Sequence, residues 1–304
     1  MNAKIFFINR NVKLSRYNIV QAYMIMGGIP YYLDYYNPSY SLAQNIDAMF
    51  FADKPKLGDE FNRLFNSVFD HSGECMKIVR LLGKRHAGFT REEIARQTGI
   101  TLNGEYSKMM KALVSSDFVT RYIPFGQSKR EEYYRLSDCF CWFWLHFKEN
   151  KQIVETDYWQ QHLKEPSINS WRGLAFEEIC MQHIIQIKSA LQIAGVSSID
   201  SSYIVRGNDE VEGIQIDLII DRADDVINVC EMKFCKSYFE VTQSYAEKEK
   251  ALYEKYKAMG VFTEEEIQTI IDADAIVDTL DILPADLDKF IEKLYTDFSG
   301  EPDE

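Results

Sequence analysis

The spacing of apolar positions between residues 74 and 136 predicts three short helices followed by two strands. Thr90 and Glu93 form the pattern T-x-x-E, a capping box that opens the second helix. The third helix is expected over 103–116. The runs FVTRYI and EEYYRL then have the β-branched and aromatic content of strands. Three helices followed by a hairpin is the order of a winged helix, a variant of the helix-turn-helix.

The segments on either side of this region also have helical spacing. Before it, the run from Tyr17 to Met26 ends at a Gly-Gly pair, and residues 1–70 are expected to form a small helical module. After it, the aromatic segment SDCFCWFWLHF is expected to pack as core or at a domain interface. The stretch PSINSWRGLAFEEICMQHIIQIKSAL then predicts one amphipathic helix.

Residues 214–233, IQIDLIIDRADDVINVCEMK, read as two apolar strands, 214–220 and 226–232, around a polar turn. Pairing about the centre of the turn places Asp217 opposite Glu231, with Cβ atoms within about 5 Å. Lys233 lies one strand step beyond Glu231, on the same face. Two opposed carboxylates repel each other unless a cation lies between them. Mg²⁺ or Mn²⁺ is therefore expected here, held by the acids and by water or phosphate.

This arrangement points to metal-dependent hydrolysis of a phosphodiester, with Lys233 orienting or activating the attacking water. Glu177, at the edge of the apolar stripe of the preceding helix, is a further candidate metal ligand. Two alternatives remain open. The hairpin end can simply reach solvent, with Asp217 and Lys233 forming a cross-strand pair. Glu177 can be an ordinary glutamate favoured by the helix dipole.

Composition narrows the class of protein. A chain of 304 residues with 46% hydrophobic and 27% charged residues is expected to be globular, with about two or three domains. No apolar run reaches the roughly 20 residues of a membrane span, and the N-terminus does not resemble a signal peptide. The six cysteines form no C-x-x-C pair, so they are expected to be reduced in a cytoplasmic protein. No G-x-x-x-x-G-K-[ST] loop occurs, so the chain is expected to have no ATP site of its own.

The net charge of −13 is unevenly distributed. Residues 240–304 hold 18 acidic against six basic residues, whereas residues 73–135 hold seven acidic against 12 basic residues. Basic and hydroxyl side chains of the third helix and the wing are candidate phosphate contacts for DNA: Ser107, Lys108, Lys111, Lys129 and Arg130. The alternative is a winged helix that docks a protein, because Glu105 and two further glutamates lie close by.

Taken in order, several stretches resemble the archaeal-type ATPases that end in a PD-(D/E)XK nuclease-like domain. They are YMIMGGIPYYL, AQNIDAMFF, the winged helix, RLSDCFCWFWLHF, WRGLAFEEIC and GIQIDLIIDRADDVINVCEMKF. The resemblance implies an α+β multidomain protein: a helical lid remnant, a winged helix, then a restriction-endonuclease-like α/β domain. The implied bounds are 1–70, 71–148 and 165–258, followed by an acidic helical tail over 259–304.

The resemblance also implies roles for individual residues. Asp217 and Glu231 match the metal-binding acids, Lys233 matches the catalytic lysine, and Glu177 matches the glutamate of the helix. The chain departs from the family at both ends, because it starts near the lid, without the P-loop domain, and ends in an unfamiliar acidic tail. A separately encoded P-loop ATPase is therefore an expected partner besides DNA. The competing class is a non-catalytic regulatory or protein-interaction module.

Overall fold

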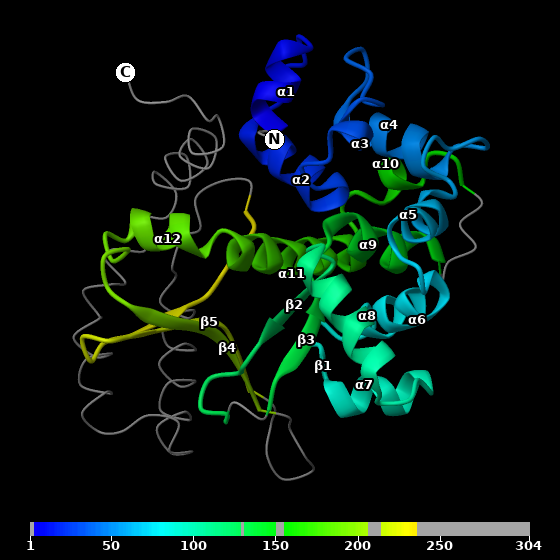
Figure 1. Cartoon of the computed structure of the whole chain (residues 1–304). Coiled ribbons are helices and arrows are strands. Elements are labelled where there is room, and N and C mark those ends of the chain that lie inside the picture. Colours follow the sequence, from blue (N-terminus) through cyan, green and yellow to red (C-terminus); the bar gives the residue numbers. More distant parts are fainter. Residues whose placement is uncertain (1–2, 129–130, 150–154, 206–213, 236–304) are drawn as a thin grey trace, which may run out of the picture. The chain divides into compact units, whose positions relative to one another are not determined.

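The structure of the protein is a computed structural model, which describes residues 3–128, 131–149, 155–205 and 214–235 (Figure 1). The described residues form two compact units. The first contains residues within 1–123 and 128–178, and the second contains 124–127 and residues from 179 onward. Helices and two three-stranded antiparallel sheets make up these units, so the expected α+β class is confirmed.

The first unit begins with a series of short helices whose ends follow from local side-chain chemistry. Ser15 caps α2 by accepting a hydrogen bond from the backbone N–H of Asn18, and Gly27 ends it at φ +60°. Ser41 and Gln44 form a capping box at α4. The elements are α1 (Ala3–Asn9), α2 (Arg16–Met26), α3 (Pro30–Leu33), α4 (Leu42–Ile46), the π-helical turn η1 (Asp47–Phe51) and α5 (Glu60–Val68).

Aromatic side chains fill the core of this unit. All six residues of α9 (Cys139–Trp144) are buried, and η2 (Leu145–Glu149) continues it. The ring centroid of Phe143 lies 5.4 Å from that of Trp159 on α10 (Tyr158–His162) and 5.5 Å from that of Trp171. These edge-to-face contacts confirm that the segment SDCFCWFWLHF packs as core.

The α6–β3 segment, residues 72–136, contains three helices and a small sheet. The Thr90–Glu93 capping box is present, and Asn103 caps α8 by accepting from the N–H of Tyr106. The strands pair in the order β1-β3-β2, all antiparallel. The elements are α6 (Ser72–Leu82), β1 (Phe89–Thr90), α7 (Arg91–Thr98), α8 (Gly104–Ser115), β2 (Val119–Tyr122) and β3 (Tyr133–Leu136).

Gly88 allows β1 to approach β3. Its φ is +71°, and a Cβ atom at this position would lie 2.1 Å from the carbonyl oxygen of Tyr134. Both the left-handed backbone and the close approach exclude a side chain. Gly88 thus allows the short strand β1 to pair with β3.

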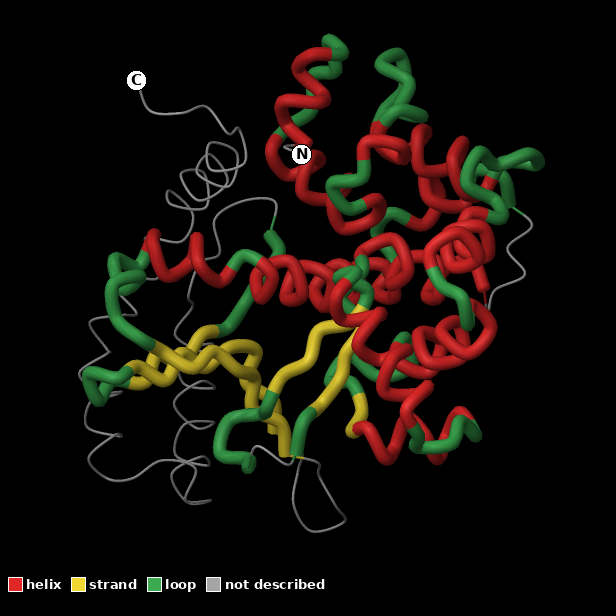
Figure 2. Tube along the Cα trace, in the orientation of Figure 1, coloured by secondary structure: helices red, strands yellow, loops and turns green. Residues whose placement is uncertain are grey.

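The expected single helix before the hairpin is in fact two helices, so that prediction is wrong. α11 (Pro166–Gln182) ends at His183, and α12 (Ile184–Ala190) starts after it (Figure 2). His183 leaves the helical conformation at φ −110° and ψ 29°, and its carbonyl oxygen accepts from the backbone N–H groups of Gln186 and Ile187. Apolar residues continue across the break, which is why their period does not reveal it.

The second unit contains a sheet in the order β4-β5-β6, formed by β4 (Ser198–Val205), β5 (Ile214–Arg222) and β6 (Ile227–Cys230). The sequence did not predict β4. The β5–β6 register runs from Asp221↔Ile227 to Leu218↔Cys230, so the paired residues end one step before the expected pair of Asp217 and Glu231. β6 ends at Cys230 instead of Met232. The reason is that the backbone N–H of Met232 donates to Oδ2 of Asp217 (2.9 Å) and not to a strand carbonyl.

A β-bulge interrupts the pairing of β4 with β5. Ser201 pairs with Ile219 and Tyr203 pairs with Ile216, so two β5 residues, Asp217 and Leu218, oppose Ser202 alone. A bulge redirects side chains locally and often lies next to a functional site. This bulge contains one of the candidate metal ligands.

None of the helices that the structure describes has the length and apolar composition of a membrane span.

Candidate functional site

Three of the expected site residues, Asp217, Glu231 and Lys233, lie at the end of the β5–β6 hairpin. Asp217 is half-buried, and Oδ2 of its carboxylate accepts a hydrogen bond from the backbone N–H of Met232 at 2.9 Å. Glu231 and Lys233 lie beyond the end of β6 and form an ion pair with each other. Their side chains are 37% and 40% exposed. Lys233 thus pairs with the carboxylate two residues before it.

The pKa of a neighbouring thiol shows the effect of burial and of the Asp217 charge. Burial, and after it the negative charge of Asp217, raise the pKa of Cys230 to about 12. Cys230 is therefore a neutral thiol at physiological pH.

The donor set at the hairpin end suits one kind of metal. Two carboxylates and solvent are the usual protein ligands of Mg²⁺, which keeps several of its waters. Across the part of the chain that the structure describes, no three His, Cys, Asp or Glu side chains are grouped closely enough to surround a metal ion. Asp217 and Glu231 alone are too few ligands for a closed structural site of the zinc type.

Glu177, the candidate ligand on α11, belongs to the first unit and contacts the α6–β3 segment there. Its Oε2 lies 3.6 Å from Nδ1 of His86, with the two side chains 15% and 16% exposed. The next residue, Glu178, pairs with Nε of Arg135 at 3.1 Å, and both side chains are buried. The α6–β3 segment thus contacts both acids of the helix.

The imidazole of His86 is held in its neutral form. Burial lowers its pKa to about 4, and the positive charge of Arg135 acts in the same direction, against a backbone hydrogen bond at Leu174. The ring of His86 also packs on that of Trp142, with centroids 5.6 Å apart. At physiological pH, the Glu177–His86 contact therefore joins a carboxylate to a neutral ring.

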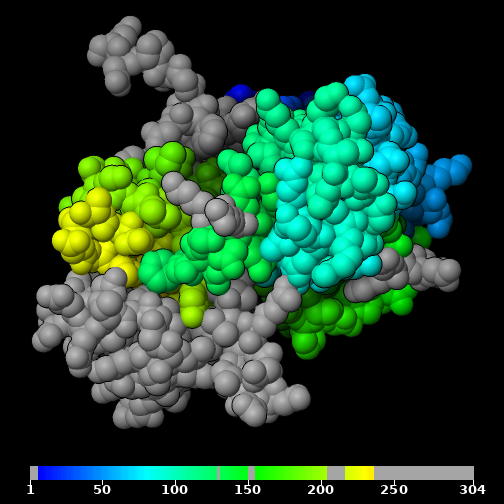
Figure 3. Space-filling model, turned by 60° about the horizontal axis from the view of Figure 1, so that its bottom comes forward, coloured from blue at the N-terminus to red at the C-terminus, as the bar shows by residue number. Residues whose placement is uncertain are grey.

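Figure 3 shows the α6–β3 segment, in cyan to green, at the surface of the molecule. The candidate DNA contacts of α8 in this segment are partly occupied by protein groups. The hydroxyl of Ser107 donates to the carbonyl oxygen of Asn103 and accepts from Arg91. Lys108 pairs with Glu105 at 2.8 Å, whereas Lys111 is exposed. Glu105 also lies 3.4 Å from His71, so one carboxylate reduces the local positive charge.

Several expectations concern residues outside those the structure describes. The wing residues Lys129 and Arg130 are among them, as are the acidic tail over 259–304 and the part of the expected nuclease-like domain beyond residue 235.

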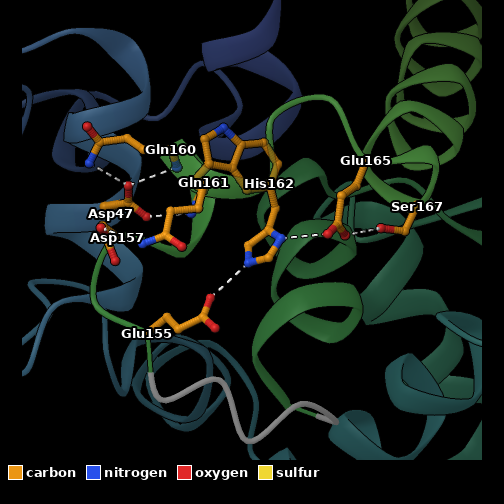
Figure 4. A network of polar contacts seen from close by, with 9 residues as sticks. Asp47, Glu155, Asp157, Gln160, Gln161, His162, Glu165 and Ser167 are labelled. Atoms are coloured by element: carbon orange, nitrogen blue, oxygen red, sulfur yellow. Dashed lines mark hydrogen bonds and ion pairs between the residues drawn. The ribbon is translucent and has the colours of Figure 1, made fainter.

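A polar network that the sequence did not reveal lies between η1 and α10 (Figure 4). Asp47 accepts hydrogen bonds from the backbone N–H of Trp159 (2.7 Å) and from the backbone and side-chain nitrogens of Gln160 (3.1 and 2.9 Å). It caps a helix more than 100 residues away, so no local pattern could have shown it. Burial raises the pKa of Asp47, whereas these hydrogen bonds lower it.

His162 in the same network lies between two carboxylates. Its Nδ1 contacts Glu165 at 2.6 Å and its Nε2 contacts Glu155 at 2.8 Å. Both contacts raise the pKa of His162, and the contact with Glu155 has the larger effect. The spacing H-x-x-E was visible in the sequence, but the role of Glu155 was not. We interpret this network as structural, because its polar groups bond to one another and to the start of α10.

Comparison with models of protein families, with curated proteins and with solved structures found no match.

Proposed function

We propose that the chain is a DNA-binding protein with a metal-dependent nuclease-like domain of the PD-(D/E)XK type. In this proposal the α6–β3 segment is a winged helix, and α11 with the β4–β6 sheet forms the part of the nuclease-like domain that the structure describes. Residues 1–70 correspond to a lid remnant. The whole resembles the C-terminal region of an archaeal-type ATPase, placed in the cytoplasm and acting with a separate P-loop subunit.

One observation carries the hydrolase proposal. The β5–β6 register, continued by one step, puts Asp217 opposite Glu231 at a hairpin end whose acidic and basic side chains reach the surface. The register follows from hydrogen-bonded backbone pairs and does not depend on the resemblance. A hydrated divalent ion between the two carboxylates would offset their repulsion.

The chemistry follows from the residues of the chain. Asp217 and Glu231 would hold Mg²⁺ or Mn²⁺, which stabilises the charge that develops on the phosphate. Lys233 would move from its ion pair with Glu231 to the attacking water once the metal neutralises that carboxylate. The hydrogen bond from Met232 to Asp217 orients the Asp217 carboxylate, because it fixes one of the two oxygens.

DNA binding is supported by the exposed Lys111 and by the basic balance of residues 73–135. The contacts would be to phosphates, because α8 presents no Arg or Asn cluster suited to base reading. The P-loop partner is supported by the resemblance alone.

The test is nicking of supercoiled plasmid in Mg²⁺ or Mn²⁺. We expect cleavage by the native chain that is lost in Asp217→Asn and in Lys233→Ala. Asp225→Asn, in the turn of the same hairpin, and Lys164→Ala, an exposed lysine of the first unit, are matched controls that should cleave normally. Cleavage that survives Asp217→Asn would refute the assignment of the site.

A non-catalytic interaction module is the second candidate. It is favoured by the pairing of Glu105 with Lys108 and His71, which weakens the positive field of α8. For such a module we expect no cleavage with any metal and a thermal unfolding midpoint that does not change when Mn²⁺ is added.

A further inference from the structure

Arg91, the first residue of α7, contacts two residues in the first turn of α8, Tyr106 and Ser107. We propose that Arg91 binds a phosphate of the DNA backbone, and that Ser107 orients Arg91 instead of contacting DNA itself. This inference rests on the proposed function, in which the α6–β3 segment binds DNA. It adds a phosphate contact to those expected from α8 and the wing.

Contacts with α8 hold the guanidinium of Arg91 in one place. Its Nη2 donates to Oγ of Ser107, and its Cζ lies over the Tyr106 ring, 5.1 Å from the centroid. The hydroxyl of Tyr106 donates to the backbone carbonyl oxygen of Arg91 at 3.0 Å, and that of Ser107 donates to Asn103. Tyr106 itself is buried, so this support is firmly packed. A side chain held in this way loses less freedom when it binds a ligand.

Arg91 has no acidic partner, in contrast to the arginines that organise this segment. Those with a glutamate partner are Arg80, Arg85, Arg121 and Arg135. In the parts of the chain that the structure describes, no carboxylate pairs with Arg91. Glu93 and Glu105, acids of α7 and α8, pair with other cations. Glu92 points about 100° away from Arg91 around the helix.

The fold gains little from a positive charge at this position. Arg91 is half-buried, and a cation removed from water without a counter-charge costs free energy. It also lies in the first turn of α7, where the helix dipole disfavours a cation. A ligand that supplies the missing negative charge explains why an arginine is kept here.

A phosphate is the anion that suits this arrangement. Nη2 of Arg91 donates to Ser107, whereas Nε and Nη1 have no protein acceptor among the described residues. The guanidinium thus keeps N–H donors for phosphate oxygens, and such charge-assisted bonds are about twice as strong as neutral ones. Contacts of this kind position a protein on DNA without reading its sequence.

The test is binding of a short fluorescein-labelled DNA duplex, followed by fluorescence anisotropy as the salt concentration is varied. For Arg91→Gln we expect Kd to rise about 10-fold at low salt. The slope of log K against log salt should become shallower by about one, because one phosphate contact is lost. The control, Arg96→Gln, removes the same charge from an exposed position in the last turn of α7. Its Kd and slope should stay close to those of the native chain.

A double-mutant cycle separates the role of Ser107 from that of Arg91. Ser107→Ala should weaken DNA binding in the native chain and have no effect in the Arg91→Gln background, because Ser107 acts through Arg91. Additive losses would show that Ser107 contacts DNA directly, which would overturn its assignment as the residue that orients Arg91.

The salt slope distinguishes a phosphate contact from a structural role. A purely structural Arg91 would lower the thermal unfolding midpoint when replaced and leave the slope unchanged, and an unchanged slope would overturn the inference. Equal slope changes in Arg91→Gln and Arg96→Gln would overturn it too, because binding would then respond to net charge alone. If the native chain does not bind the duplex, the proposed DNA binding itself fails, and the inference fails with it.

Discussion

The two acidic sites of the molecule hold their charges in opposite ways. On α11, Glu178 is buried with Arg135, and Glu177 is largely enclosed beside His86. At the hairpin end, Glu231 and Lys233 pair in contact with solvent, and Asp217 accepts a backbone hydrogen bond. A buried pair is strongly destabilising to break, whereas an exposed pair contributes little. The buried α11 pair is therefore expected to contribute more to the stability of the fold than the solvent-exposed pair of Glu231 and Lys233.

Breaking the buried pair should have the largest effect. Arg135→Met leaves the Glu178 carboxylate buried without its cation, and we expect the free energy of unfolding to fall by about 3–5 kcal/mol. Urea denaturation measures this change. The double variant Arg135→Met/Glu178→Met should recover much of the loss. Arg121→Met, which breaks the more exposed pair with Glu132, is the control and should change stability by less than about 1 kcal/mol.

Asp47, a buried acid that belongs to neither site, tests whether burial alone accounts for the difference. Asp47→Ala removes the acceptor of three hydrogen bonds at the start of α10, and we expect a loss of about 2 kcal/mol. Asp157→Ala removes an exposed contact with Gln161 in the same network. Equal urea midpoints for the two variants would show that burial does not decide how much these two acids contribute to stability.

The hairpin pair should contribute least to the fold. Without metal, Lys233→Ala should change the free energy of unfolding by less than about 1 kcal/mol, because its ion pair is exposed. A loss as large as that of Arg135→Met would mean that Lys233 is structural, and the contrast between the two sites would disappear.

His162 adds a further case to the comparison of buried with exposed pairs. It lies in the first unit and pairs with Glu155 and Glu165 in contact with solvent. Its pKa is raised in the folded state, so its contribution is fully present below the unfolded pKa of about 6.5 and is lost as the pH rises through the folded pKa. NMR titration of the imidazole should show the raised pKa, and Glu155→Gln should lower it. An unchanged pKa in that variant would contradict the role of Glu155.

Local patterns predicted the elements that local chemistry determines. The Thr90–Glu93 capping box, the glycine after α2 and the turn of the β5–β6 hairpin each place an element end or a register. From the last of these, the sequence also predicted the register of β5 with β6, whose last pair is Leu218 with Cys230. These predictions held because a cap or a turn acts on residues a few positions away.

Contacts between distant segments could not be predicted in this way. The partner of Glu178 is 43 positions earlier, and that of Asp47 is more than 100 positions later, so no spacing connects them. The break at His183 was hidden because the apolar period continues through it. β4 was missed because its sequence, SIDSSYIV, mixes serines with apolar residues and lacks a clear alternation.

At the β-bulge, β5 has one residue more than β4. The pairing of this sheet is therefore sensitive to a change in the length of β5. Deleting Leu218 would restore even pairing with β4, and it would turn Ile216 and Asp217 to the opposite sides relative to β6. Asp217 would then take the buried place of Leu218, opposite Cys230, and Ile216 would replace the carboxylate opposite Glu231. Conservative substitutions of the apolar residues here are therefore less disruptive to packing than the loss of a single residue, so the length of this strand matters as well as its composition.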